Sequence, residues 1–160
     1  MEMVIAPVSK EYDDALCHII QSVGAEYGAV GEGFGPSDDE VRAMSQHYTF
    51  DRKSLYLLAF VNGKLMGGCG VAPFNDRDDV CELKKLFLLK ESRGLGLGRK
   101  LSEQCLEFAL NQGFEQCYLD TLSNMTDAVS LYERMGFKHL TQPFEGTFHN
   151  GCDVWMMKSL

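Results

Sequence analysis

The stretch DVCELKKLFLLKESRGLGLGRKL, residues 79–101, decides how this chain folds. Its first half is an apolar run of the kind that forms a buried strand. Its last residues begin an amphipathic helix that continues to Gly113. Glycine at every second position between the two parts gives the turn unusual backbone freedom. The apolar stripe of the helix consists of Leu97, Leu101, Cys105 and Ala109.

The turn between this strand and this helix is predicted to bind a compact anion. The first N–H groups of the helix have no partner within it, and the helix dipole adds partial positive charge there. Basic residues outnumber acidic ones by six to one from Lys84 to Lys100, in a chain of formal net charge −8. This pattern favours a phosphate or pyrophosphate and argues against nucleic acid as a partner. Lys84 and Lys85 themselves are predicted to be solvated surface charges.

Two common phosphate-binding motifs do not fit the turn. A Walker A loop needs Gly-Lys-Ser/Thr, whereas Gly98 is followed by Arg99 and Lys100. A dinucleotide fingerprint needs G-x-G-x-x-G, whereas Gly94, Gly96 and Gly98 give G-x-G-x-G. A dehydrogenase-like nucleotide domain is therefore disfavoured.

The rest of the chain alternates between strand and helix patterns without a linker or repeat. Ser37 and Glu40 have the spacing of a capping box, which predicts a second short helix after the first. Asn62-Gly63 between two apolar runs predicts a tight hairpin. The predicted order is strand, helix, helix, three strands, helix, strand, helix and two closing strands. We therefore expect one domain over residues 1–160, with an α/β (α+β) mixed sheet and helices on both faces.

Composition narrows the class of protein. Apolar residues make up 45% of the 160 residues, and no apolar run has the length of a membrane span. The first residues lack the layout of a signal peptide, which predicts a cytoplasmic protein. The six cysteines are scattered singly and are predicted to be reduced, and no Cys/His spacing indicates a metal site.

Two sequence motifs together resemble a known family. Arg93-Gly94-Leu95-Gly96-Leu97-Gly98 resembles the R/Q-x-x-G-x-G/A signature of the GNAT superfamily of N-acetyltransferases, and AVSLYERMGF, residues 128–137, resembles its second signature. The resemblance implies a sheet that splays at a cofactor cleft. It also implies acetyl transfer from acetyl-CoA to a primary amine of a small molecule or peptide, directly within a ternary complex. A non-catalytic acyl-CoA-binding module is the alternative.

The resemblance implies which residues hold the cofactor. The amides of Leu95, Gly96, Leu97, Gly98 and Arg99 would bind the pyrophosphate of coenzyme A, with Arg93 and Gly94 shaping the turn. Arg99 or Lys100 would meet the ribose phosphate. Main-chain groups of Leu86, Phe87 and Leu88 would pair with the pantetheine arm. Met125 stands where many relatives have Asn, so the neighbouring Asn124 is the candidate for that contact.

Transfer to an amine also needs a base and an acid, because alkylammonium groups are protonated at neutral pH. The resemblance makes Glu82 the candidate base and Tyr132 the candidate acid that protonates the CoA thiolate. His149 or a water molecule is the alternative base. The acceptor pocket is expected from residues 32–48 and 144–152, where Arg42 would suit an acceptor carboxylate. A homodimer through the final strands is a further expectation.

Overall fold

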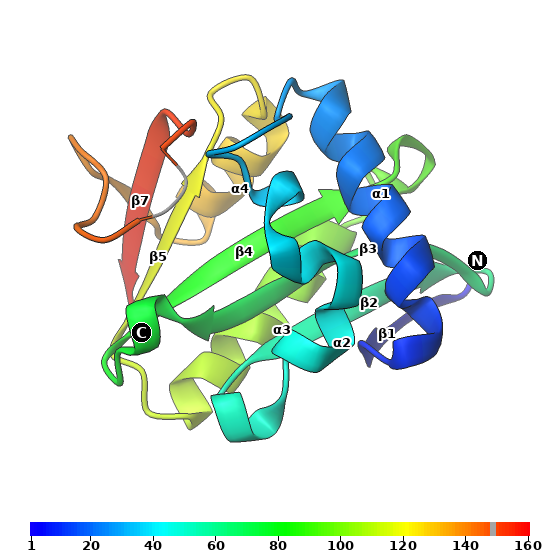
Figure 1. The fold of residues 1–160 in the computed structure, drawn as a ribbon, viewed down its shortest axis with the longest axis horizontal. Helices are drawn as coiled ribbons and strands as arrows, with labels where there is room; N and C mark the ends of the chain where they lie inside the picture. The colour runs from blue at the N-terminus through cyan, green and yellow to red at the C-terminus, as the bar shows by residue number, and fades with distance from the viewer. Residues whose placement is uncertain (148–149) are drawn as a thin grey trace.

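A seven-stranded sheet runs through the molecule in the order β1-β2-β3-β4-β5-β7-β6 (Figure 1). The structure is a computed structural model and describes residues 1–147 and 150–160. Within these described residues, β4 and β5 pair in parallel and the other neighbouring strand pairs are antiparallel. The mixed α/β sheet predicted from the sequence is thus confirmed. The strands are β1 Met3–Pro7, β2 Leu55–Val61, β3 Lys64–Pro73, β4 Val80–Leu88, β5 Gln116–Thr121, β6 Lys138–His139 and β7 Val154–Ser159.

Helices cover both faces of this sheet. The apolar residues of α1 and α2 share one core with Tyr56, Leu58 and Phe87 of the sheet. On the other face, the predicted stripe of α3 is at most 1% exposed and packs in a second core with Tyr132 of α4. Figure 1 shows α1 and α2 in front of the sheet and α3 behind it. The α-helices are α1 Asp13–Glu26, α2 Met44–His47, α3 Leu97–Asn111 and α4 Thr126–Arg134.

The predicted hairpin between β2 and β3 is confirmed. Asn62 and Gly63 form its two-residue loop with φ of 49° and 79°, and Val61 pairs with Lys64. Two successive positive φ angles are the mark of a type I′ turn, which matches the twist of antiparallel strands. The Asn-Gly dipeptide could therefore be recognised as a turn without tertiary information.

Strand β4 is bent by a bulge and then leaves β5. Its register with β3 shifts between Gly68, which faces Phe87, and Gly70, which faces Lys84. Lys85 and Leu86 lie inside the shift, and Lys85 has a φ of 57°, as one residue of a bulge often does. Pairing of β4 with β5 is limited to the stretch from Val80 to Glu82, so the two strands separate beyond it. This is the splayed sheet that the resemblance implied.

The second helix is shorter and begins later than the capping box predicts. The segment instead forms two 3-10 turns, Gly35–Ser37 and Asp39–Ala43, before α2. Ser37 makes no cap to a helix; its Oγ accepts a hydrogen bond from the N–H of Gly31 at 3.0 Å. Pro36 is buried and packs close to Gly24 of α1, so tertiary packing overrides the local cap signal. Among the described residues, no helix is both long and apolar enough to cross a membrane.

Candidate active site

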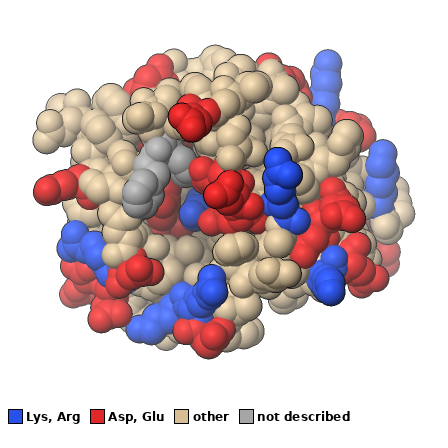
Figure 2. Space-filling view, in the orientation of Figure 1, with Lys and Arg blue, Asp and Glu red and all other residues tan. Residues whose placement is uncertain are grey.

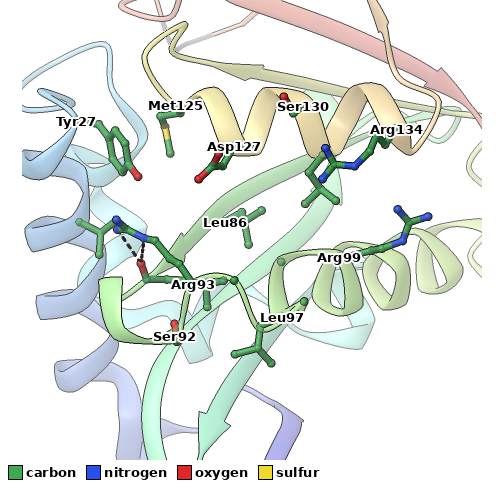
Figure 3. A pocket seen from close by; sticks show the side chains of 17 residues that line it. Tyr27, Leu86, Ser92, Arg93, Leu97, Arg99, Met125, Asp127, Ser130 and Arg134 are labelled. Carbon is green, nitrogen blue, oxygen red and sulfur yellow. Dashed lines mark hydrogen bonds between the residues drawn. The ribbon is translucent and has the colours of Figure 1, made fainter.

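A cavity of about 580 Å³, hereafter the large cavity, opens where β4 leaves β5 (Figure 3). The end of α1, the end of β4, the glycine-rich turn, the start of α3 and one side of α4 line it. In Figure 3, α3 and α4 form facing walls, and Leu86 of β4 lies between them. The two sequence motifs, which are separated along the chain, therefore meet at one site.

The glycine-rich turn supplies backbone groups to the large cavity. Gly94 and Gly96 both have a φ of 81°, which side chains other than glycine rarely adopt. Gly96 directly precedes Leu97, the first residue of the 15-residue helix α3. The unpaired N–H groups at that helix start and the positive end of the helix dipole thus lie at the cavity, as an anion site requires.

Arg93 lines the large cavity at the start of the turn and joins the turn to two other elements. Its Nε and Nη2 donate hydrogen bonds to the carbonyl oxygen of Leu88, at 3.2 and 3.0 Å. Its Nη1 lies 2.5 Å from a carboxylate oxygen of Glu26, and its guanidinium lies 5.4 Å from the centre of the Tyr27 ring. The hydrogen bond from Arg93 lowers the pKa of Glu26. Arg93 therefore ties the turn to the end of β4 and to the end of α1.

Two further arginines face the large cavity from opposite helices. Arg99 of α3 lines it while its Nε lies 2.9 Å from Oε1 of Glu103. Arg134 of α4 lines the same cavity together with Ser130 and Asp127 (Figure 3). Sequence reasoning missed these three α4 residues, although their spacing of three and four residues places them on one helix face.

Lys100, the alternative to Arg99 at the ribose phosphate, does not line the large cavity. It is exposed on α3, one position beyond Arg99. Successive helix residues point about 100° apart, so both side chains cannot face the same cavity equally. The structure therefore favours Arg99 over Lys100 for any contact in this cavity.

Residues of β4 line two different cavities. Leu86 and Leu88 line the large cavity, whereas residues 82–85 and Phe87 line a second cavity of about 60 Å³, hereafter the small cavity. The edge of β4 that faces β5 is not paired with it beyond Glu82. Main-chain groups on that edge are thus placed to bond an extended ligand arm in a strand-like way.

Asn124 is turned away from the large cavity. Its Nδ2 donates a 2.8 Å hydrogen bond to the carbonyl oxygen of Tyr27, which ties the start of α4 to the end of α1. Met125 instead lines both cavities. The substitution at this position therefore places a flexible apolar side chain at the junction of the two cavities.

Glu82 and Asp120 both line the small cavity. Glu82 pairs with Tyr118 across β4 and β5, and Asp120 lies two residues further along β5, on the same face of the sheet. Asp120 accepts a 2.6 Å hydrogen bond from the hydroxyl of Thr147. Two carboxyl groups thus lie where the strands begin to separate. Both segments expected to form the acceptor pocket contribute to the lining of the small cavity, with Phe34, Gly35 and Pro36 from the first and Cys152 from the second.

Other sequence candidates lie elsewhere. Arg42 is exposed and lines neither cavity. His149, the alternative base, lies outside the described residues.

All six cysteines are free thiols, and burial raises the pKa of Cys152 and Cys117. Within the described residues, no group of three or more His, Cys, Asp or Glu side chains is placed to hold a metal ion.

The prediction that Lys84 and Lys85 are solvated is wrong. The side chain of Lys85 is 1% exposed, and that of Lys84 is 16% exposed. Nζ of Lys85 lies 2.8 Å from Oδ2 of Asp38 and 3.0 Å from Oε2 of Glu40. Burial would raise the pKa of Glu40, but Lys85 and Lys84 outweigh it and lower that pKa. The bulge turns Lys85 inward, which a regular strand alternation could not indicate. Figure 2 shows acidic side chains gathered over the middle of this face, with basic ones between them.

Tyr132 is placed in the core on the α3 face of the sheet. It is 6% exposed and makes an edge-to-face contact with Phe137 at 5.8 Å between ring centres. Burial raises the pKa of its hydroxyl well above the ordinary value, and the nearby thiols of Cys69 and Cys117 add to this effect. The hydroxyl therefore stays protonated at neutral pH, as an acid must. Tyr132 does not line the large cavity, whereas its neighbour Leu131 does.

Comparison with known proteins agrees with this geometry. The model of the acetyltransferase (GNAT) family matches residues 21–137. The uncharacterised N-acetyltransferase YjgM of Escherichia coli K12 is 32% identical over 159 residues, which is 98% of this chain and 95% of YjgM.

Solved structures share the fold. A GNAT-family acetyltransferase from Staphylococcus aureus Mu50 superposes with a TM-score of 0.84 at 19% identity, covering 99% of both chains. The PaiA N-acetyltransferase of Thermoplasma acidophilum, solved in complex with coenzyme A, superposes with a TM-score of 0.78 at 20% identity over the whole of both chains. With its two motifs assembled around one cavity, this chain belongs to the acetyltransferase (GNAT) family.

Proposed function

We propose that this protein is an acetyl-CoA-dependent N-acetyltransferase that acts on a primary amine of a small molecule or peptide. The observation that carries the proposal is the pair of cavities on the two sides of the splayed strand β4, which share Met125. A donor in the large cavity and an acceptor in the small cavity would meet where β4 and β5 separate. Direct transfer in a ternary complex would suit that arrangement, because donor and acceptor would reach the same point from two different cavities.

The large cavity suits coenzyme A. Its pyrophosphate would bind the amides of residues 95–99 at the start of α3, and Arg99 and Arg134 would add charge from opposite walls. The pantetheine arm would lie along the unpaired edge of β4 near Leu86 and Leu88. The complex of the Thermoplasma relative with coenzyme A supports this choice of donor.

Glu82 and Tyr132 would carry the proton transfers. Glu82 lines the small cavity and would take a proton from the acceptor ammonium, directly or through water. The amine nitrogen then bonds to the thioester carbonyl carbon and would release its second proton to solvent, the carbon–sulfur bond breaks, and CoA leaves as a thiolate. Tyr132 would supply the proton that converts this thiolate to the thiol and would regain a proton from solvent.

The test is release of free CoA thiol with a panel of amino acids, polyamines, aminoglycosides and peptides. We expect Glu82→Gln and Tyr132→Phe each to lower kcat by about 10- to 1,000-fold, with CoA affinity retained. His149→Ala compares the alternative base suggested by the sequence. Wild-type turnover in both Glu82→Gln and Tyr132→Phe would remove these two roles. A persistent acetyl-enzyme in the mass spectrum would contradict direct transfer.

A non-catalytic acyl-CoA-binding module is the second candidate. The observation that favours it is the burial of Tyr132 outside the lining of the large cavity. Coenzyme A binding seen by calorimetry, with no CoA release for any amine in the panel, would establish this alternative.

Two further expectations remain proposals. The six free thiols suit the reducing cytoplasm, where we place the protein. A homodimer through β6 and β7 is also proposed, because β6 is a short strand at the edge of the sheet. Sedimentation at several protein concentrations checks the dimer.

A further inference from the structure

Lys85 is a buried ammonium that the reaction outlined above does not use. Its side chain is 1% exposed, and its Nζ contacts Oδ2 of Asp38 at 2.8 Å and Oε2 of Glu40 at 3.0 Å. A buried charge is strongly unfavourable unless it is paired with good geometry. The two carboxylates therefore have to stay close to Lys85 for β4 to keep its course.

The backbone of Lys85 is as unusual as its side chain. It lies in the left-handed region at a φ of 57°, inside the register shift between β3 and β4. Its carbonyl oxygen accepts a 2.7 Å hydrogen bond from the hydroxyl of Tyr56, which is fully buried. Glycine adopts this conformation at lower cost, so Lys85 is held in a strained backbone conformation.

The partners of Lys85 belong to a different part of the chain. Asp38 and Glu40 lie in the segment of 3-10 turns, 45 or more positions before Lys85. Glu40 also accepts a hydrogen bond from the hydroxyl of Tyr48 and lies 3.6 Å from Nζ of Lys84. The ion pairs thus join this segment to the bulge.

The two joined parts meet at the cavities, and Lys85 itself lines the small cavity. Residues 34–36, which end two positions before Asp38, form a wall of the small cavity, and we call them the acceptor wall. Leu86 and Leu88, which directly follow Lys85, line the large cavity. One ammonium group therefore connects the wall of one cavity with the strand of the other.

We propose that Lys85 is a positioning residue that sets the acceptor wall against the donor-binding end of β4. This inference rests on the proposed function, in which the two cavities hold the two substrates. Lys85 acts through Asp38 and Glu40 and through the bulge. Its loss lets the acceptor wall and the main chain at Leu86 move independently, so both substrates are held less well.

The experiment separates positioning from stability with a charge-compensated pair. Lys85→Met alone leaves two half-buried carboxylates without this ammonium, and we expect a large fall in Tm. The double variant Lys85→Met with Asp38→Asn removes one of those carboxylates and is expected to recover most of the Tm. We expect it still to bind coenzyme A about tenfold more weakly by calorimetry, and to raise the acceptor KM by about tenfold.

Two comparison variants complete the design. Asp13→Ala removes a buried carboxylate that accepts a 2.9 Å hydrogen bond from the N–H of Ser45, and Asp13 lines neither cavity. It is expected to lower Tm while leaving CoA affinity and acceptor KM within twofold of wild type. Lys85→Arg keeps a cation. Compared with Lys85→Met, it is expected to recover part of the CoA affinity and part of the increase in acceptor KM.

The outcomes are distinct. A folded double variant with wild-type CoA affinity and wild-type acceptor KM overturns the proposal and leaves Lys85 as a stabilising ion pair only. If the Lys85→Met variants do not fold, Glu40→Gln replaces them, and wild-type constants in that variant overturn the proposal equally. If the wild type binds coenzyme A but acetylates no amine, the proposed function fails, and the CoA affinity of the variants alone decides the role of Lys85.

Discussion

The side chain of Arg93 donates two hydrogen bonds to one acceptor, the carbonyl oxygen of Leu88, at 3.2 Å from Nε and 3.0 Å from Nη2. Leu88 is the last residue of β4, and Arg93 begins the glycine-rich turn. The contact closes the loop between strand and helix, so the turn amides and the edge of β4 face one cavity. The relative placement of the two surfaces proposed to bind the donor thus depends on one guanidinium.

We therefore expect Arg93→Ala to raise the Kd for coenzyme A by about tenfold or more and to destabilise the fold by about 1–2 kcal/mol. The side chain of Arg93 is 27% exposed, so solvent weakens its contacts and the expected loss of stability is smaller than for a fully buried charged hydrogen bond. Calorimetry and urea unfolding measure the two effects. Arg77→Ala is the control, because Arg77 makes a similar two-bond contact to Asp79 but lines neither cavity. Equal CoA affinity in both variants would contradict the role of Arg93.

Gly96→Ala tests the turn itself. Gly96 has a φ of 81°, and an added Cβ would meet no atom within 4 Å, so only backbone strain opposes the change. We expect a loss of about 1–2 kcal/mol of stability and at least about tenfold weaker CoA binding, because the strained turn shifts its amides.

Gly113→Ala is the matched control for this strain. Gly113 follows the other end of α3 with a φ of 94°, and an added Cβ there also meets no atom within 4 Å. It should cost similar stability and leave CoA affinity unchanged. Similar CoA affinity in the two variants would show that the turn does not hold the donor.

Arg134→Gln tests the α4 wall that sequence reasoning missed. Because Arg134 faces the large cavity, we expect CoA binding to weaken by about tenfold and to depend less steeply on salt. Lys100→Gln, which alters an exposed side chain outside the cavity lining, should change affinity by less than about threefold. The reverse order of effects would contradict the role of Arg134 in CoA binding.

The pH profile tests Tyr132 as the acid. Burial raises the pKa of this tyrosine, so the protonated form that an acid requires persists through the alkaline range in the folded protein. We expect kcat to rise as the acceptor is deprotonated and to show no fall below about pH 10 from tyrosine ionisation. Tyr132→Phe should lower the whole profile without changing its shape. A falling limb near pH 9 in the wild type, absent in Tyr132→Phe, would contradict a raised pKa.

Glu40 links stability to pH. Its pKa is lowered from 4.5 because Lys85 and Lys84 outweigh the effect of burial. A lowered carboxyl pKa means that its stabilising contribution is complete above about pH 5 and is lost as the pH falls through the folded-state pKa. We expect Glu40→Gln to cost about 1–3 kcal/mol at pH 7 and to reduce the additional loss between pH 5 and pH 3. Urea unfolding between pH 3 and pH 7 measures the free energy of unfolding of the wild type and of Glu40→Gln. If the two free energies fall in parallel as the pH is lowered, the linkage is contradicted.

Much of the fold could be predicted from local patterns in the sequence. The stripe of α3, the Asn62-Gly63 hairpin and the strand–turn–helix unit rely on periodicity or on glycine conformations, which neighbouring residues specify. The capping box at Ser37 failed for the opposite reason. Packing of Pro36 against α1 decided that segment, and no local pattern reveals such a contact.

The sequence by itself determined the strand–turn–helix unit that we propose holds the donor, because a glycine-rich turn between an apolar strand and an amphipathic helix is a local arrangement. Only the tertiary structure decided which side chains share a cavity. It placed Arg134 opposite Arg99, turned Asn124 to Tyr27, and buried Lys85 between Asp38 and Glu40. These relations join residues far apart in the chain. They depend on helix packing and on a bulge that changes the direction of one strand, which residue spacing alone does not encode.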